Sequence, residues 1–227
     1  MPTLLLYFVL AAPAIFVMLY AQRKMRSAYS KYSKVANRRG ITGLEAAQML
    51  LRANGLVHVR LEGTRGNLTD HYDPRRRVLR LSRGVSATPS VAALGIVAHE
   101  VGHAVQHSLG YAPMRVRSAL VPVANLGSRL GFIFFFLGII IYSANLVWIG
   151  VGLFGAAVAF SLVTLPVEYD ASNRARRMLQ GAGLVSEAEL EGVSSVLSAA
   201  ALTYVAALLQ AVANLLFFVL IALGMRR

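Results

Sequence analysis

The sequence contains no cysteine. This absence excludes disulfide bonds, thiolate metal ligands and a cysteine nucleophile, so a transition-metal site would have to be built from His, Asp and Glu side chains. Acidic residues are also scarce, because 10 Asp and Glu stand against 23 Lys and Arg, for a formal net charge of +13. A catalytic or metal-binding site therefore has few carboxylates to draw on.

Charge is missing altogether from several long stretches. Hydrophobic residues make up 56% of the chain and the mean hydropathy is +0.58, which is typical of membrane proteins. Leu4–Ala21 is an apolar run long enough to cross a bilayer, and we interpret it as a retained anchor because no small-residue cleavage site follows it. Leu130–Val167 is nearly twice the length of one span, and its polar break at Tyr142–Asn145 predicts two helices joined by a tight loop. In the charge-free segment Gly192–Met225, residues 205–223 predict a fourth span.

The basic residues fall between the predicted spans. Arg23–Arg39 holds 7 of them and no acid, and Arg60–Arg83 holds another 7. With four spans these clusters share one side, and only Arg226 and Arg227 fall on the other. The positive-inside rule then predicts an integral protein of the bacterial cytoplasmic membrane, with residues 23–118 in the cytoplasm and both termini outside. This explains the basic charge through the lipid bilayer, and we predict no nucleic-acid partner.

The cytoplasmic segment has a mixed pattern. Helical spacing predicts a helix over Gly43–Ala53, ending at Asn54-Gly55. Val57–Leu61 and Val78–Leu81 alternate like short strands, and Asp73-Pro74 is a turn signal that favours a β-hairpin ending in the second of them. Thr88-Pro89 is typical of a helix start, with Thr88 as the N-cap of a helix that runs to about Ser108.

This last predicted helix carries His99, Glu100 and His103. Residues four apart on a helix share one face, so the two imidazoles can occupy adjacent vertices of a tetrahedral zinc site. Glu100 projects beside that face, where it can take a proton from a zinc-bound water. Gly102 and the small neighbouring residues allow close packing behind the metal. The structural alternative is a buried helix whose histidines form hydrogen bonds with neighbouring residues and bind no metal.

A zinc enzyme needs a third protein ligand. Gln106 and Leu109 stand where the metzincin pattern requires Gly and His, so that class is excluded. His107 lies two turns from His99, but three histidines along one straight helix are poorly placed for one metal, and we interpret His107 as a supporting or helix-end residue. Glu168 is the favoured third ligand, with Asp170 or Ser172 orienting a ligand histidine through its other ring nitrogen. The alternative is that Glu168 and Asp170 pair with the basic residues at 174–177.

Three further residues are candidates for a supporting or oxyanion-stabilising role. His71 and its neighbour Tyr72 lie in the predicted hairpin. The structural interpretation is that they only help to form the turn. The functional interpretation is that one of them donates a hydrogen bond to the oxyanion of the tetrahedral intermediate. Tyr204 is also a candidate, although its small neighbours favour a packing role. The edge of the 78–81 strand is a candidate for pairing with an extended substrate backbone.

The candidate site residues lie in five separated blocks of the sequence. In these blocks the chain resembles the YugP-like family of membrane-bound neutral zinc metallopeptidases. The blocks are Thr42–Ala47, Leu68–Pro74, Ala98–His107, Thr164–Ser172 and Ala199–Ala207. The resemblance implies a zinc-dependent endopeptidase with His99, His103 and Glu168 as ligands and Glu100 as base. The chain is more remotely similar to gluzincin membrane proteases of protein quality control. Those carry an acid four residues after the ligand glutamate, where this chain has Ser172.

The sequence therefore predicts a mainly α integral membrane protein with about four transmembrane helices and a small α+β zinc-peptidase domain that contains a β-hairpin. We expect one zinc ion and a protein or peptide substrate, with a role in membrane-protein quality control. The rival hypotheses are an intramembrane protease of the site-2 type and a noncatalytic zinc-binding membrane scaffold. The predicted segments are an anchor helix at 1–22, a zincin-like segment at 23–118, a transmembrane hairpin at 119–166, a ligand helix and connection at 167–200, and a fourth transmembrane helix at 201–225.

Overall fold

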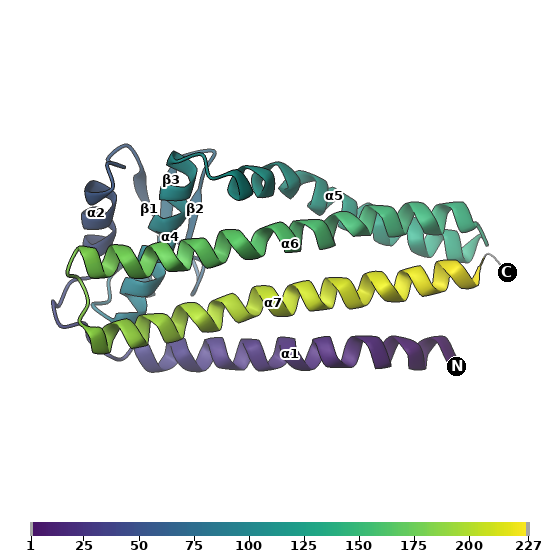
Figure 1. The fold of residues 1–227 in the computed structure, drawn as a ribbon, viewed down its shortest axis with the longest axis horizontal. Helices are drawn as coiled ribbons and strands as arrows, with labels where there is room; N and C mark the ends of the chain where they lie inside the picture. The colour runs from purple at the N-terminus through teal and green to yellow at the C-terminus, as the bar shows by residue number, and fades with distance from the viewer. Residues whose placement is uncertain (1, 226–227) are drawn as a thin grey trace. The chain divides into compact units, whose positions relative to one another are not determined.

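The structure is a computed structural model that describes residues 2–225, so the predicted outer charges at Arg226 and Arg227 lie outside the described residues. The elements in chain order (Figure 1) are α1 (Pro2–Tyr32), α2 (Gly43–Ala53), β1 (Arg60–Thr64), β2 (His71–Asp73), β3 (Val78–Ser82), α3 (Arg83–Ser86), α4 (Val91–Ser108), α5 (Ala112–Ile140), α6 (Ala144–Gly181) and α7 (Glu187–Gly224).

The chain divides into two compact units. The helical unit comprises Met1–Gln22, Ala112–Pro166 and Leu202–Arg227, and the mixed unit comprises Arg23–Tyr111 and Val167–Ala201. Residues of α1, α6 and α7 belong to both. Among the described residues, four helices are long and apolar enough to cross a membrane, namely α1, α5, α6 and α7. Together with the small sheet of the mixed unit, these four helices confirm the predicted fold class.

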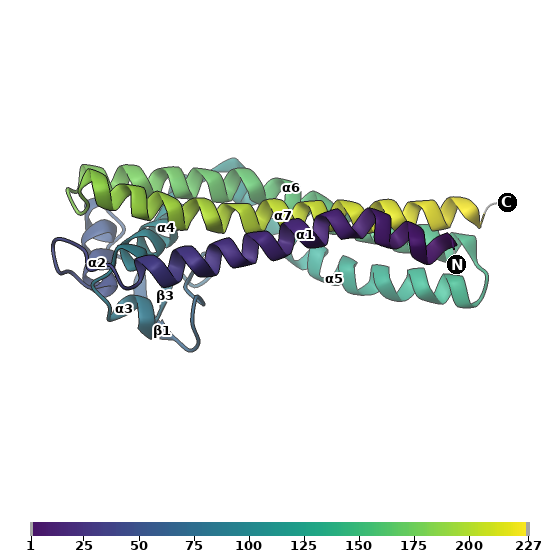
Figure 2. The same ribbon diagram turned by 90° about the horizontal axis from the view of Figure 1, so that it is seen from below.

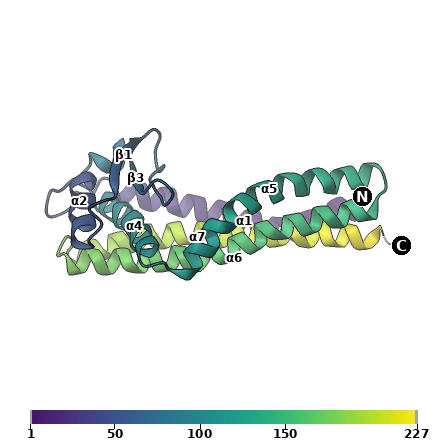
Figure 3. The same ribbon diagram turned by 90° about the horizontal axis from the view of Figure 1, so that it is seen from above.

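In the helical unit, α5 and α6 form the predicted hairpin (Figure 3), and the loop between them covers residues 141–143, which overlap the predicted polar break at Tyr142–Asn145. Glycines let the two helices approach closely, because a Cβ added to Gly150 would lie 2.6 Å from the backbone nitrogen of Phe135. Beyond this contact, Phe135 and Val151 form a buried cluster with Phe218 of α7. Both hairpin helices are longer than predicted, since α5 begins at Ala112 and α6 continues through Pro166 to Gly181. The segment expected as a separate ligand helix is thus the second half of α6.

The mixed unit contains a three-stranded sheet in the order β1-β3-β2 (Figure 1). The predicted β2–β3 hairpin is present as an antiparallel pair, with Tyr72 opposite Leu79. Asp73 fixes its turn, because Oδ1 accepts hydrogen bonds from the backbone N–H groups of Arg75 and Arg76 at 3.0 and 3.1 Å. β1 pairs in parallel with β3. It begins at Arg60, three residues after the predicted start, because residues 57–59 form a turn that follows α2.

The position of β3 in the sheet corrects one expectation. β3 is the central strand, paired on both sides by β1 and β2. Its hydrogen-bonding edges are therefore occupied, and it cannot accept a substrate strand. The outer strand near the metal-binding helix is β2, whose Tyr72 N–H donates a hydrogen bond to Glu100.

The helix α4 begins later than predicted. Its N-cap is Ser90, whose hydroxyl accepts a hydrogen bond from the backbone N–H of Ala93 at 3.2 Å. Thr88 is not the cap, because Pro89 and Ser90 are held extended by backbone contacts to residues 35–37, including Asn37 N–H to Pro89 O at 2.9 Å. The buried face of α4 packs on α1 and α7 within the mixed unit, through a cluster that includes Ala28, Ala92 and Val196 (Figure 2).

Candidate metal centre

The helix α4 holds the two predicted histidine ligands in a rigid setting. His103 is buried and His99 is partly buried, while the neighbouring Ala98 and Val101 are fully enclosed. Because the residues around the histidines are apolar and tightly packed, the direction of each imidazole is set by the helix and by a few polar neighbours.

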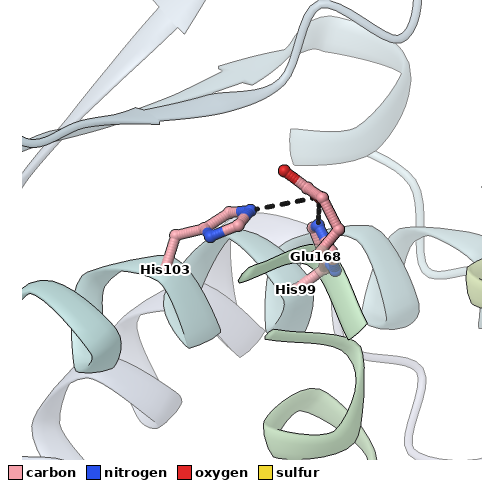
Figure 4. Close-up of side chains that lie close together, drawn as sticks. All are labelled: His99, His103 and Glu168. Atoms are coloured by element: carbon pink, nitrogen blue, oxygen red, sulfur yellow. Dashed lines mark hydrogen bonds and ion pairs between the residues drawn. The ribbon is translucent and has the colours of Figure 1, made fainter. Parts of the chain in front are cut away.

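Glu168 of α6 points into the gap between the two imidazoles (Figure 4). Its Oε2 atom lies 3.1 Å from His99 Nε2 and 3.5 Å from His103 Nε2. The ligand atoms of the three residues all lie within 4.8 Å of one another. The side chain of Glu168 is 2% exposed, so this carboxylate is buried with only polar neighbours to compensate its charge.

This geometry fits a zinc ion. Nitrogen and oxygen ligands about 2.0–2.2 Å from a tetrahedral zinc are separated from each other by roughly 3.4 Å. The two histidine-to-carboxylate distances of 3.1 and 3.5 Å match that separation. Two neutral imidazoles and one carboxylate are also a donor set that zinc enzymes use, with a fourth position left for water.

The close approach of α6 to α4 depends on a glycine. A Cβ added to Gly102 would lie 2.8 Å from the carbonyl oxygen of Ala171. Any larger residue would push the two helices apart, and Glu168 would move away from the histidines with them. The expectation that Gly102 permits tight packing behind the site is confirmed.

Each ligand histidine has a second polar partner at its other ring nitrogen. Ser172 Oγ lies 3.2 Å from His99 Nδ1. Ser172 was one of the two residues, with Asp170, that were predicted to orient a histidine in this way. His103 Nδ1 lies 2.9 Å from Oε1 of Gln106. Asp170 contacts Gln106 at 2.8 Å and is thereby linked to His103 through that amide. These contacts leave the Nε2 atoms directed at Glu168, as metal ligation requires.

Glu100 lies on the flank of α4 that faces the hairpin. Its Oε2 accepts a hydrogen bond from the backbone N–H of Tyr72 at 2.9 Å. Burial raises the pKa of the Glu100 carboxyl, against the opposing influence of His103 and His99. A carboxylate whose pKa is moved toward neutrality is suited to accept a proton at physiological pH.

His107 and Tyr72 form a hydrogen-bonded pair beside Glu100. The Tyr72 hydroxyl lies 2.9 Å from His107 Nδ1. His107 and Glu100 are seven residues apart, which on an α-helix is a rotation of only about 20° from alignment. Tyr72 therefore contacts both residues, through its backbone at one and its phenol at the other.

The structure also gives the positions of the remaining candidates His71, Asp170 and Tyr204. His71 is exposed in β2, with Nδ1 2.8 Å from Thr69 O and Nε2 3.3 Å from the Arg80 guanidinium. Successive side chains of a strand alternate between faces, so His71 points away from the α4-facing side that Tyr72 occupies. Asp170 also pairs with Arg174 at 2.6 Å, as the alternative interpretation expected for this residue. Tyr204 lies on α7 in the helical unit.

Gln106 is the residue whose importance the sequence analysis missed, because it served there only to exclude the metzincin pattern. It is completely buried. One signal was available: it is a strongly polar residue one turn after a predicted ligand histidine, and its neighbours Ala104 and Val105 are apolar. A side chain of that kind needs buried hydrogen-bond partners.

Comparisons with known proteins identify the family to which the chain belongs. A family model described as "Putative neutral zinc metallopeptidase" matches residues 7–223. The "Putative membrane protease YugP" of Bacillus subtilis (strain 168) is 46% identical over 222 residues, which cover 98% of this chain and 99% of that protein. No solved structure matches the chain at a significant level.

Proposed function

Because this chain belongs to the family of neutral zinc metallopeptidases, we propose that it is a membrane-embedded zinc endopeptidase with His99, His103 and Glu168 as ligands and Glu100 as general base. The observation that carries the proposal is that the ligand atoms of two imidazoles and one buried carboxylate all lie within 4.8 Å of one another. Glu100 directly follows the first of these histidines in the sequence.

The residues divide the chemistry between them. When bound, a zinc ion would lower the pKa of a coordinated water toward ~7 and polarise the scissile carbonyl. The Glu100 carboxylate would accept a proton from the attacking water and return it to the leaving amine. The hydrogen bond from Tyr72 N–H holds the Glu100 carboxylate in place.

The outer edge of β2 lies next to the proposed base and is a candidate binding surface for the substrate backbone. Because Tyr72 N–H is directed at Glu100, the peptide groups of residue 72 point away from β3, as those of every second residue do in an antiparallel pair. The N–H of residue 72 is already donated to Glu100, so an extended substrate can pair with this edge only through the Tyr72 carbonyl oxygen, on the side of the sheet next to α4. The substrate is accordingly a peptide segment that can become extended, as in an unfolded or misassembled membrane protein, which fits a role in quality control.

The Tyr72 hydroxyl is the proposed donor to the carbonyl oxygen that gains negative charge. It lies on the Glu100 flank of α4 and is held by His107 at 2.9 Å. His71 is not proposed for this role, because its ring lies on the opposite side of the strand and contacts Arg80. Tyr204 stays a prediction.

The basic residues support a cytoplasmic active site with both termini outside, in the cytoplasmic membrane of a bacterium. Both seven-residue basic clusters belong to the mixed unit, which also contains the candidate metal ligands. Positive charge of this density favours the cytoplasmic side.

Two observations weigh against the rival hypotheses. Among the described residues, α4 is not one of the helices apolar and long enough to span a membrane, whereas a site-2-type enzyme carries its motif inside the bilayer. A noncatalytic scaffold has no need of Glu100, which takes no part in the donor set.

Metal removal tests the proposed function. We expect the purified protein to bind one zinc per chain, to lose casein cleavage after treatment with a chelator and dialysis, and to regain it with one equivalent of zinc. Cleavage that persists in metal-free protein would show that another mechanism operates.

A further inference from the structure

Gln106 stands at the centre of a buried polar chain behind His103. Its side chain makes three hydrogen bonds: Oε1 lies 2.9 Å from His103 Nδ1, and Nε2 lies 2.8 Å from both the carbonyl oxygen of Val167 and Oδ2 of Asp170. The residue is 0% exposed. No water can substitute for these contacts without repacking, so the amide is fixed in one orientation.

That orientation determines the protonation of His103. Val167 O and the Asp170 carboxylate are both acceptors, so the NH₂ group of Gln106 must face them and its oxygen must face His103. The opposite orientation would set the amide oxygen against two other oxygens. An acceptor at Nδ1 requires the proton of His103 to lie on Nδ1, which leaves the lone pair of Nε2 directed toward Glu168 and the proposed metal.

Asp170 adds charge to this chain. Its Oδ2 accepts hydrogen bonds from both Gln106 and Arg174, the latter at 2.6 Å. A carboxylate that accepts from an amide N–H polarises the amide, which makes the amide oxygen a stronger acceptor. The His103 imidazole then becomes a better donor of its lone pair. His99 differs, because its Nδ1 meets only the neutral hydroxyl of Ser172 at 3.2 Å.

We propose that Gln106 is a positioning residue that couples the Asp170 carboxylate to His103 and thereby sets the zinc affinity of the site. This inference rests on the proposed zinc function.

The test is the zinc dissociation constant, measured by competition with a chromogenic chelator on the full-length protein in detergent. Loss of an outer hydrogen-bond partner of a ligand typically weakens metal binding by about 10- to 100-fold. We expect a loss of that size for Gln106→Leu, a smaller loss for Asp170→Asn, which keeps a hydrogen-bonding oxygen but removes the charge, and the smallest for Ser172→Ala. Gln48→Leu on the exposed face of α2 is the matched control and should bind as wild type does.

Two further readouts separate positioning from general damage. The visible spectrum of the cobalt-substituted protein should change for Gln106→Leu, because the His103 ring is no longer held. Thermal unfolding of the metal-free proteins shows whether each variant folds, and Gln106→Met replaces Gln106→Leu if the latter does not.

The outcomes distinguish this inference from the proposed function. If wild type binds no zinc, or if His103→Ala binds it as well as wild type, the metal site itself is wrong. If His103→Ala loses zinc while folded Gln106→Leu binds within about twofold of wild type, only the role of Gln106 is wrong. Wild-type affinity in Asp170→Asn would overturn the coupling to the carboxylate.

Discussion

The backbone N–H of Tyr72 donates a hydrogen bond to Oε2 of Glu100 at 2.9 Å. This contact connects the edge strand of the sheet with the proposed catalytic base. The same residue contacts His107 through its hydroxyl, so β2 is hydrogen-bonded to the metal-binding helix through one side chain and one peptide group of Tyr72.

Tyr72→Phe should lower the rate of peptide cleavage by about 100-fold, the size of effect seen when an oxyanion donor is lost. Zinc content should stay at the wild-type value, because the phenol is not among the ligands. Steady-state kinetics on a quenched fluorescent peptide give kcat and KM separately, and the loss should appear in kcat. Tyr142→Phe, at a side chain that is 89% exposed, is the control. An unchanged kcat in Tyr72→Phe would remove the hydroxyl from the mechanism.

Glu168→Ala should reduce bound zinc at least tenfold, because a third ligand is lost and two histidines alone bind zinc weakly. Elemental analysis after gel filtration measures the zinc content directly. Glu191→Ala, which removes an exposed carboxylate of α7, should keep one zinc per chain. Equal zinc contents in the two variants would reject Glu168 as a ligand.

His107 should make the fold less stable in mild acid. Burial, together with the charges of Arg77 and His58, lowers the pKa of His107 below its usual value of about 6.5. Between the lowered pKa of the folded state and the usual pKa of the unfolded state, the unfolded chain binds more protons than the folded one. The contribution of neutral His107 to the free energy of unfolding is therefore lost as the pH falls through this window. The midpoint of thermal unfolding, followed from about pH 7.5 to about pH 5 on metal-free protein, should fall less steeply in His107→Gln than in wild type. Parallel slopes would contradict this assignment.

The predicted topology can be tested by labelling, because the chain has no cysteine of its own. Ser143 lies in the α5–α6 loop and Ser33 directly follows α1. In intact cells a membrane-impermeant maleimide should label Ser143→Cys but not Ser33→Cys, and Ser33→Cys should react only after the cells are permeabilised. The reverse pattern would place the active site outside.

Local signals in the sequence were sufficient for much of the fold. Charge-free runs predicted the four spans, and Asp73-Pro74 predicted the β2–β3 hairpin, because each depends on residues close together in the chain. Glu168 could be proposed across a separation of 69 residues from His99 because carboxylates are few and because it lies on the same predicted side of the membrane as the helix. The family resemblance implied the same ligand, whereas no spacing rule did.

Other features depended on contacts that no local pattern encodes. Thr88 and Ser90 are both good N-caps, and backbone contacts with residues 35–37 decide in favour of Ser90. The strand order places β3 in the centre of the sheet, although its sequence gives no sign of two neighbours. Gln106 finds its partners 61 and 64 residues away, on a helix whose register relative to α4 is set by the contact at Gly102.

The central claim is that Glu100 is the base of a zinc-dependent hydrolysis, and Glu100→Gln tests it most directly. The amide keeps the size of the side chain but cannot accept the proton from water at neutral pH. Zinc content and peptide cleavage should be measured on the same preparation. We predict one zinc per chain and a loss of cleavage of at least about 1000-fold, within the range that a general base and its positioning contribute. A Glu100→Gln protein that holds its zinc and cleaves peptides at the wild-type rate would contradict the claim.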